Sequence, residues 1–265
     1  MRRNPFSFLA LALVMAVMAT TARRMRDGAQ AAAQTSEEQE AGVPCQETST
    51  CAEHGVIDAT IGPPVVTLEY AEACRDVAYL CTGLDWRDGS ARVFRWSETT
   101  RLITVLVPLP AGPQSSARDA QQAAMRGVRA WDKHPFPILV VDKDRGRPID
   151  ITVEWMGTPP GNQLGLTSTR WRQTGQKATL EVTSFRLALA SPSSGRPLEA
   201  RDIELTAAHE MGHALGLPHS DQSRDVMYPT NTATTLSARD YRAMEALYRL
   251  PNGVGIWQGR DPTRY

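Results

Sequence analysis

Histidine is scarce in this chain, with 5 among 265 residues, and aromatic residues make up only 6%. An excess of either charge is also lacking, because 29 Lys and Arg residues balance 29 Asp and Glu residues. A balanced chain has neither the basic excess that binds nucleic acid nor an acidic run that collects cations. We therefore expect no nucleic-acid partner. Because histidine is scarce, several histidines close together in the sequence indicate a functional site.

Three of those histidines lie between residues 209 and 219, in His-Glu-Met-Gly-His-Ala-Leu-Gly-Leu-Pro-His. On a helix, positions four apart share one face, so His209 and His213 can both place a ring nitrogen about 2.0–2.1 Å from one zinc ion. Gly216 can end that helix with a positive φ, and the chain then returns His219 as a third ligand. Three neutral imidazoles leave a fourth position open, which is typical of a catalytic zinc.

Glu210 lies directly after the first predicted ligand. Its carboxylate cannot easily be a third ligand, but it can hold a water molecule on the metal and take its proton. A site in which the histidines only stabilise the fold would leave Glu210 without a role. The motif therefore predicts a zinc hydrolase with Glu210 as its general base.

The pattern HExxHxxGxxH with a downstream methionine resembles the metzincin zinc endopeptidases. Ser220 after the third histidine, and Met227 after six intervening residues, are similar to the matrixin branch, the family of matrix metalloproteinase catalytic domains. The resemblance implies that Met227 forms the turn beneath the zinc. It also implies that Tyr228, Pro229 and Thr230 begin the wall of the pocket for the substrate side chain after the cleaved bond.

The surrounding periodicity predicts an α+β domain. β-branched runs bounded by breakers predict the strands 102–109, 138–141, 149–155 and 178–183, and helical spacing predicts helices over 115–132, from near 202 to 216, and 241–250. The stretch 161–175 is expected to be a loop. The resemblance implies a metzincin-like zinc protease domain over 91–250, with a twisted mixed β-sheet, two long helices and a C-terminal helix. It also implies that 178–183 is the edge strand that pairs with extended substrate.

Three polar side chains are expected to cap helix starts, namely Ser116, Asp202 and Ser237. Trp131 ends the first long helix, before Pro135, and is expected to be a core residue that closes this helix onto the sheet.

The N-terminus predicts export. Arg2 and Arg3 precede an apolar run from 6 to 18, and small residues follow to Ala22, as in a cleaved signal peptide over 1–22. The protein would then be secreted, extracellular or periplasmic. The alternative is an uncleaved membrane anchor over residues 6–22, which the arginines at 23, 24 and 26 would suit.

Segments of low hydrophobicity are predicted on both sides of the catalytic domain. Residues 23–44 lack large apolar side chains and are expected to be a disordered linker. Residues 251–265 are expected to be a tail.

All four cysteines lie in the segment 45–90, and an even count in an exported chain predicts two disulfides. Three pairings are open, of which Cys45–Cys51 with Cys74–Cys81 is preferred. This segment could be a pro-segment. A cysteine switch at Cys45 is not favoured, because the surrounding residues lack the arginine and glycine of the family's motif.

Further metal sites find little support in the sequence. His54 and His134 are isolated, so one zinc ion is expected. Asp142, Asp144 and Asp150 could help to hold a calcium ion, but their spacing fits no calcium loop, and solvated surface charge is the preferred interpretation.

The sequence thus predicts a monomeric, exported zinc endopeptidase that cleaves extracellular proteins or peptides. Two alternatives stay open: a catalytically inactive zinc-binding adhesion or regulatory protein that uses the same groove, and a zinc hydrolase of a non-peptide amide.

Overall fold

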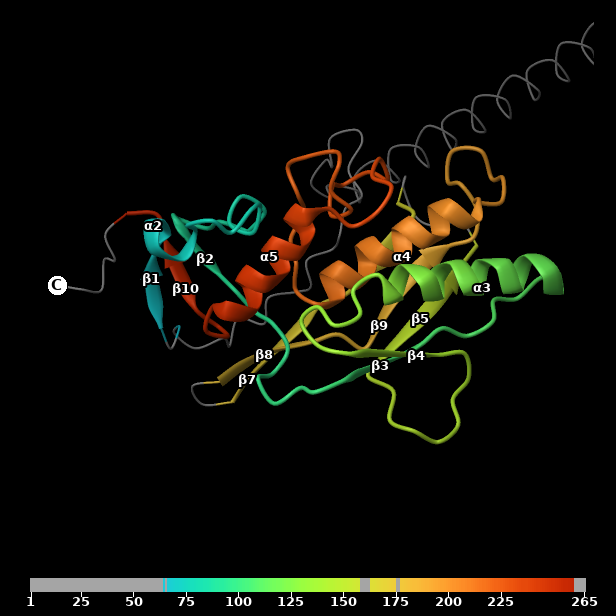
Figure 1. Ribbon diagram of the computed structural model, residues 1–265, viewed down its shortest axis with the longest axis horizontal. Coiled ribbons are helices and arrows are strands. Elements are labelled where there is room, and N and C mark those ends of the chain that lie inside the picture. Colours follow the sequence, from blue (N-terminus) through green and yellow to red (C-terminus); the bar gives the residue numbers. More distant parts are fainter. Residues whose placement is uncertain (1–63, 65, 158–162, 175–176, 260–265) are drawn as a thin grey trace, which may run out of the picture. The chain divides into compact units, whose positions relative to one another are not determined.

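The computed structural model describes residues 64, 66–157, 163–174 and 177–259 (Figure 1). The predicted signal peptide or anchor (1–22), the linker 23–44, Cys45, Cys51 and His54 lie outside the described residues. Within the described part of the chain, no helix is long and apolar enough to cross a membrane.

The main sheet has five strands in the order β4-β3-β5-β9-β6. Four strands are parallel, and the edge strand β6 runs antiparallel to β9. In three of the parallel strands, β4, β5 and β9, buried apolar residues alternate with more exposed ones, as expected of strands with one face toward the core. The strands are β3 (Ile103–Leu106), β4 (Ile138–Val141), β5 (Ile151–Met156), β6 (Gly165–Thr167) and β9 (Ser184–Ala188).

Helices α3 (Gln114–Arg129) and α4 (Ala200–Ala214) lie side by side over this sheet (Figure 1). Their backbones approach closely at Gly127, where an added Cβ would lie 2.2 Å from the carbonyl oxygen of Glu204. Trp131 is fully buried behind α3, and its indole nitrogen donates a 2.7 Å hydrogen bond to the carbonyl oxygen of Ala208. The prediction of Trp131 as a core residue is confirmed, and with it the α+β fold of a mixed sheet under two long helices.

The third long helix, α5 (Ala238–Arg249), begins with a capping box in which Ser237 and Asp240 satisfy each other's backbone amides. The prediction for Ser237 is confirmed, but those for Ser116 and Asp202 are wrong. The helices α3 and α4 begin after Pro113 and Glu199, without side-chain caps. Asp202 instead lies in the first turn of α4, where its charge suits the helix dipole.

A hairpin separate from the main sheet is formed by β7 (Arg170–Thr174) and β8 (Lys177–Glu181). The prediction that 178–183 forms the sheet's edge strand is therefore wrong, because β6 occupies that edge. The stretch 161–175 is not only a loop, since it contains β6 and β7. Its strands are short and depend on their partners, so the sequence pattern did not reveal them.

The prediction of a tail over 251–265 is wrong for residues 251–259, which are part of the fold. Strand β10 (Gly255–Trp257) is the centre of a three-stranded sheet, parallel to β1 (Thr67–Glu69) and antiparallel to β2 (Ser90–Arg92). Ile256 is fully buried there. A strand of three residues that follows a glycine turn has little strand propensity of its own. Strand β10 is therefore stabilised by pairing with its two neighbours, β1 and β2.

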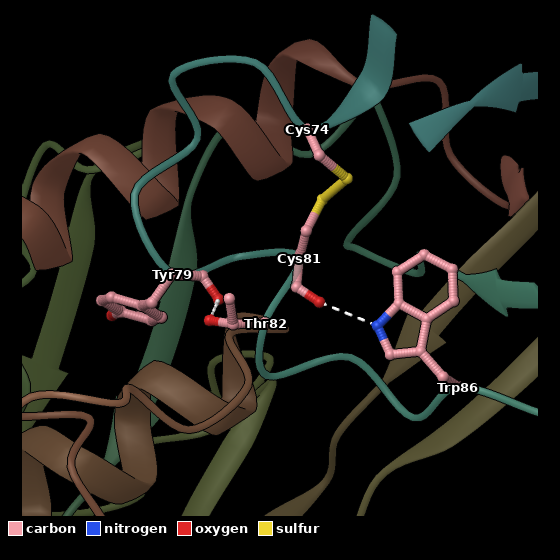
Figure 2. The surroundings of a disulfide bond; sticks show 5 residues. All are labelled: Cys74, Tyr79, Cys81, Thr82 and Trp86. Atoms are coloured by element: carbon pink, nitrogen blue, oxygen red, sulfur yellow. Dashed lines mark hydrogen bonds between the residues drawn. A yellow bond between two sulfur atoms is a disulfide. The ribbon is translucent and has the colours of Figure 1, made fainter. Parts of the chain in front are cut away.

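The N-terminal described segment packs onto the domain and carries the predicted Cys74–Cys81 disulfide, which is confirmed (Figure 2). The short helix α2 (Tyr70–Ala73) precedes it. Inside the disulfide loop, Tyr79 is fully buried. Trp86 beyond it donates a 2.9 Å hydrogen bond to the carbonyl oxygen of Cys81 (Figure 2).

Candidate active site

The three predicted histidines converge on one point. His209 and His213 lie one turn apart on α4, and His219 returns after Gly216, whose φ of +103° favours glycine. The Nε2 atom of His213 lies 3.0 Å from that of His209 and 3.2 Å from that of His219. Three nitrogens on one tetrahedral zinc, about 2.0–2.1 Å from it, would be roughly 3.3 Å apart. The donor set therefore fits a small divalent metal ion.

Backbone carbonyls orient two of these rings. The Nδ1 atom of His209 lies 2.7 Å from the carbonyl oxygen of Val226, and that of His213 lies 2.8 Å from the carbonyl oxygen of Leu217. A proton on each Nδ1 would leave each Nε2 lone pair directed at the shared point. Burial also lowers the pKa of His209, against the opposing effects of the Val226 hydrogen bond and the Asp240 charge, which favours the neutral ring that a metal needs.

Glu210 is buried under the edge strand β6. Its Oε2 accepts a 2.6 Å hydrogen bond from the hydroxyl of Thr167. A Cβ atom on Gly165 would lie 2.4 Å from Glu210 Oε1, so the backbone of β6 passes directly over the carboxylate. Neither Gly165 nor Thr167 was predicted as a site residue, because the stretch 161–175 was expected to be a loop.

The surroundings of Glu210 favour its protonated form. Burial raises the pKa of Glu210 from 4.5 to about 8, while the Thr167 hydrogen bond opposes the shift. A cation held by the adjacent histidines would favour the carboxylate. A carboxyl group with this environment can both accept and return a proton.

Met227 lies fully buried beside α4, where Gly212 makes room for it. A Cβ atom on Gly212 would lie 2.3 Å from the Met227 sulfur. The Met227 carbonyl accepts a 2.8 Å hydrogen bond from the amide of Ser220, the residue after His219. This bond ties the methionine turn to the chain that carries the third histidine.

Two buried carboxylates support this turn. Asp240 accepts hydrogen bonds from the amide of Val226 at 3.0 Å and from the hydroxyl of Tyr79 at 2.8 Å. Asp225 accepts from the hydroxyls of Ser220 and Ser237. No role for either aspartate was predicted from the sequence, because nothing in the neighbouring residues indicates that these carboxylates are buried.

Tyr228, Pro229 and Thr230 follow the turn and are partly exposed. None of them lines the cavity of about 370 Å³ that borders His213. Their role as a pocket wall stays a prediction.

The other predicted polar residues lie apart from the histidine group. Asp150 accepts a 2.7 Å hydrogen bond from the amide of Thr104, and Asp144 accepts from Gly146, so both support local backbone. His134 contacts the ring of Tyr241, with 4.7 Å between ring centroids. Within the described ranges, the three histidines are the only such group of three or more potential metal ligands.

Comparison with known proteins shows which protein family this chain resembles. Residues 96–249 match the family model of the matrixins. Macrophage metalloelastase of Rattus norvegicus is 39% identical over 62 residues, 21% of this chain and 13% of that protein. Macrophage metalloelastase of Oryctolagus cuniculus is 47% identical over 56 residues, 19% of this chain and 12% of that protein.

A longer and more distant match is Metalloendoproteinase 1 of Glycine max, which is 25% identical over 146 residues, 55% of this chain and 45% of that protein. The chain thus spans less than half the length of these curated relatives. Since the family model covers more than half of this chain and includes the histidine group, the glutamate and the methionine turn, the chain belongs to the matrixin family.

Proposed function

We propose that this chain is a zinc-dependent endopeptidase that hydrolyses peptide bonds of extracellular proteins. One observation carries the proposal: three imidazole Nε2 atoms converge beside a buried carboxyl group, Glu210, under an open sheet edge. The membership of the matrixin family supports the same activity.

His209, His213 and His219 would hold the zinc ion, which when bound polarises a carbonyl group and lowers the pKa of a water molecule. Glu210 takes the proton of the attacking water and then transfers it to the leaving amine. Thr167 donates a hydrogen bond to Oε2 of Glu210 and so fixes the orientation of the carboxyl group. The carbonyl oxygen of Val226 holds the ring of His209, and Met227 packs against Gly212 of the same helix.

We also propose that the protein is exported, with the signal peptide or anchor at residues 1–22. The Cys74–Cys81 disulfide supports this proposal, since disulfides persist in oxidising compartments.

Substitution of the general base tests the activity. Glu210→Gln keeps the size of the side chain but removes its basicity, and should lower kcat/KM on quenched-fluorescent peptides by at least about 10³-fold. Zinc content after dialysis, measured by elemental analysis, should match that of the wild type. Glu245→Gln on the exposed side of α5 is the matched control and should cleave normally.

Full cleavage by a zinc-loaded Glu210→Gln variant would contradict the proposal. A wild-type protein that binds peptides without cutting them would instead favour the adhesion or regulatory alternative.

A further inference from the structure

A cavity of about 370 Å³ lies beside the metal group, bordered by His213. One wall comes from the part of the chain that matches the matrixins, with Thr169, Trp171 and Pro218. The other wall comes from outside the match, with Leu84 and Trp257. The N-terminal segment and β10 therefore add a wall to the active-site region.

This added wall is packed closely against the third histidine. A Cβ atom on Gly83 would lie 2.3 Å from the carbonyl oxygen of His219 and 2.9 Å from Cβ of Pro218. Phe94 stacks on Trp171, with ring centroids 4.9 Å apart. The cavity thus has a rigid, largely aromatic and aliphatic lining of the kind that binds apolar side chains.

Charged groups lie at the same lining. Arg87 and Asp85 form an ion pair of 3.0 Å, and the Arg92 guanidinium lies 5.4 Å from the centroid of the Phe94 ring. The Asp85–Arg87 pair offers little to a charged ligand, because each of these two groups already has an opposite neighbour, and Nε of Arg92 donates a 3.2 Å hydrogen bond to the carbonyl oxygen of Gly253. The apolar part of the cavity therefore decides what it binds.

The direction of β6 indicates which part of a substrate reaches the cavity. The strand passes over Glu210 at Gly165 and continues through Thr167 toward Thr169 and Trp171. A peptide that adds to this edge as an antiparallel strand runs the opposite way. Its residues before the cleaved bond would then lie near Thr169.

We propose that this cavity is a specificity pocket for a large apolar side chain among the three residues that precede the cleaved bond. The proposal rests on the proposed peptidase function. It makes the segment Gly83–Phe94 a part of the substrate site and not a removable inhibitory segment. The continuity of the cavity with His213 is the observation that ties it to the reaction centre.

A plug in the pocket tests this proposal in the full chain. Thr169→Phe would fill the cavity, whereas Ser168→Phe adds the same ring at an exposed neighbour that does not line it. The measurement is kcat/KM on peptides that differ only in carrying Phe, Leu or Ala at each of the three positions before the bond. At one position, wild type and Ser168→Phe should prefer Phe or Leu over Ala by about tenfold or more. Thr169→Phe should bring that ratio close to one.

A second measurement separates this proposal from the peptidase function. N-acetyl-L-phenylalaninamide is titrated into the full chain while the indole NMR signals of Trp171 and Trp257 are followed, with N-acetylglycinamide as the control. A saturable shift in wild type and Ser168→Phe, lost in Thr169→Phe, is expected whether or not peptides are cut.

The outcomes are distinct. Peptide cleavage without any upstream preference, or a preference that Thr169→Phe retains, overturns the pocket and leaves the peptidase function standing. If no peptide is cut, the function fails, and the indole shift alone supports or overturns the pocket. A cavity already filled by the chain's own preceding residues would show neither preference nor shift, which also overturns the proposal.

Discussion

The hydroxyl of Tyr79 donates a 2.8 Å hydrogen bond to Oδ1 of Asp240, although the two residues are 161 positions apart. Both side chains are fully buried. The other carboxylate oxygen of Asp240 accepts the amides of Val226 and Ser237. A residue of the N-terminal segment therefore shares the carboxylate that supports the methionine turn.

Loss of this bond should destabilise the protein. Tyr79→Phe removes the hydroxyl and should lower the free energy of unfolding by about 1.5–3 kcal/mol, because the acceptor is a buried carboxylate. Urea unfolding measures the change. The control is Tyr70→Phe, at a tyrosine that is 38% exposed, which should change the free energy by less than about 0.5 kcal/mol. Equal stability of the two variants would show that the bond contributes nothing.

Alkaline pH should weaken the fold through the buried tyrosines. Burial, followed by the charge of Asp240, raises the pKa of Tyr79 well above 10.0, and burial also raises that of Tyr248. The unfolded chain releases these protons near pH 10 while the folded chain keeps them. Stability is therefore complete below pH 10 and falls as the pH rises above it.

The slope of that fall can be measured. Each tyrosine contributes up to about 1.4 kcal/mol per pH unit above pH 10. Urea unfolding of Tyr79→Phe at pH 9, 10 and 11 should show a shallower slope than wild type. Tyr70→Phe should keep the wild-type slope, and a Tyr79→Phe slope equal to it would contradict the prediction.

Gly165→Ala should damage the reaction more than the fold. The new methyl group would lie 2.4 Å from Glu210 Oε1 and would displace the carboxyl group or the strand. A displacement of about 1 Å at a reacting group costs on the order of 10²-fold, so kcat/KM on a peptide substrate should fall by that factor. Gly157→Ala is the matched control, since among the described residues no heavy atom beyond its chain neighbours lies within 4 Å of its Cβ position. Unchanged kinetics at equal zinc content would refute a tight contact at Gly165.

Removal of the Cys74–Cys81 disulfide should destabilise the N-terminal segment. The two residues are 7 positions apart, and a loop of this length predicts a loss of about 2–3 kcal/mol from unfolded-state entropy. The Cys74→Ala/Cys81→Ala variant leaves no polar group at the buried Cys81 position. Urea unfolding should show a lower midpoint than wild type. Dithiothreitol should lower the wild-type midpoint and affect the variant less; a variant as stable as wild type would contradict the prediction.

The metal group was predictable because its geometry is local. His209 and His213 follow from helical spacing, and Gly216 signals the reversal that returns His219. Likewise, runs of β-branched and leucine residues such as Ile138–Val141 identify the parallel strands, because such side chains pack well on a half-buried pleated surface.

The features that escaped prediction depend on distant partners. Strand β6 has three residues and gains its identity from β9, while its Gly165 is required only because Glu210 lies beneath it. The same holds for Asp225, whose burial depends on Ser220 and Ser237. The hydrophobic periodicity of a single segment does not indicate which distant residues will contact it.

The position of β10 also has a consequence for synthesis on the ribosome. Gly255 pairs with Thr67, so the partners are 188 positions apart (255 − 67). At about 5–20 residues per second, the histidine helix leaves the ribosome before β10 does. Until then β1 and β2 lack the strand that joins them, and the wall that Trp257 contributes is missing. The pocket proposed above therefore gains its Trp257 wall only after β10 has left the ribosome, later than the histidine helix.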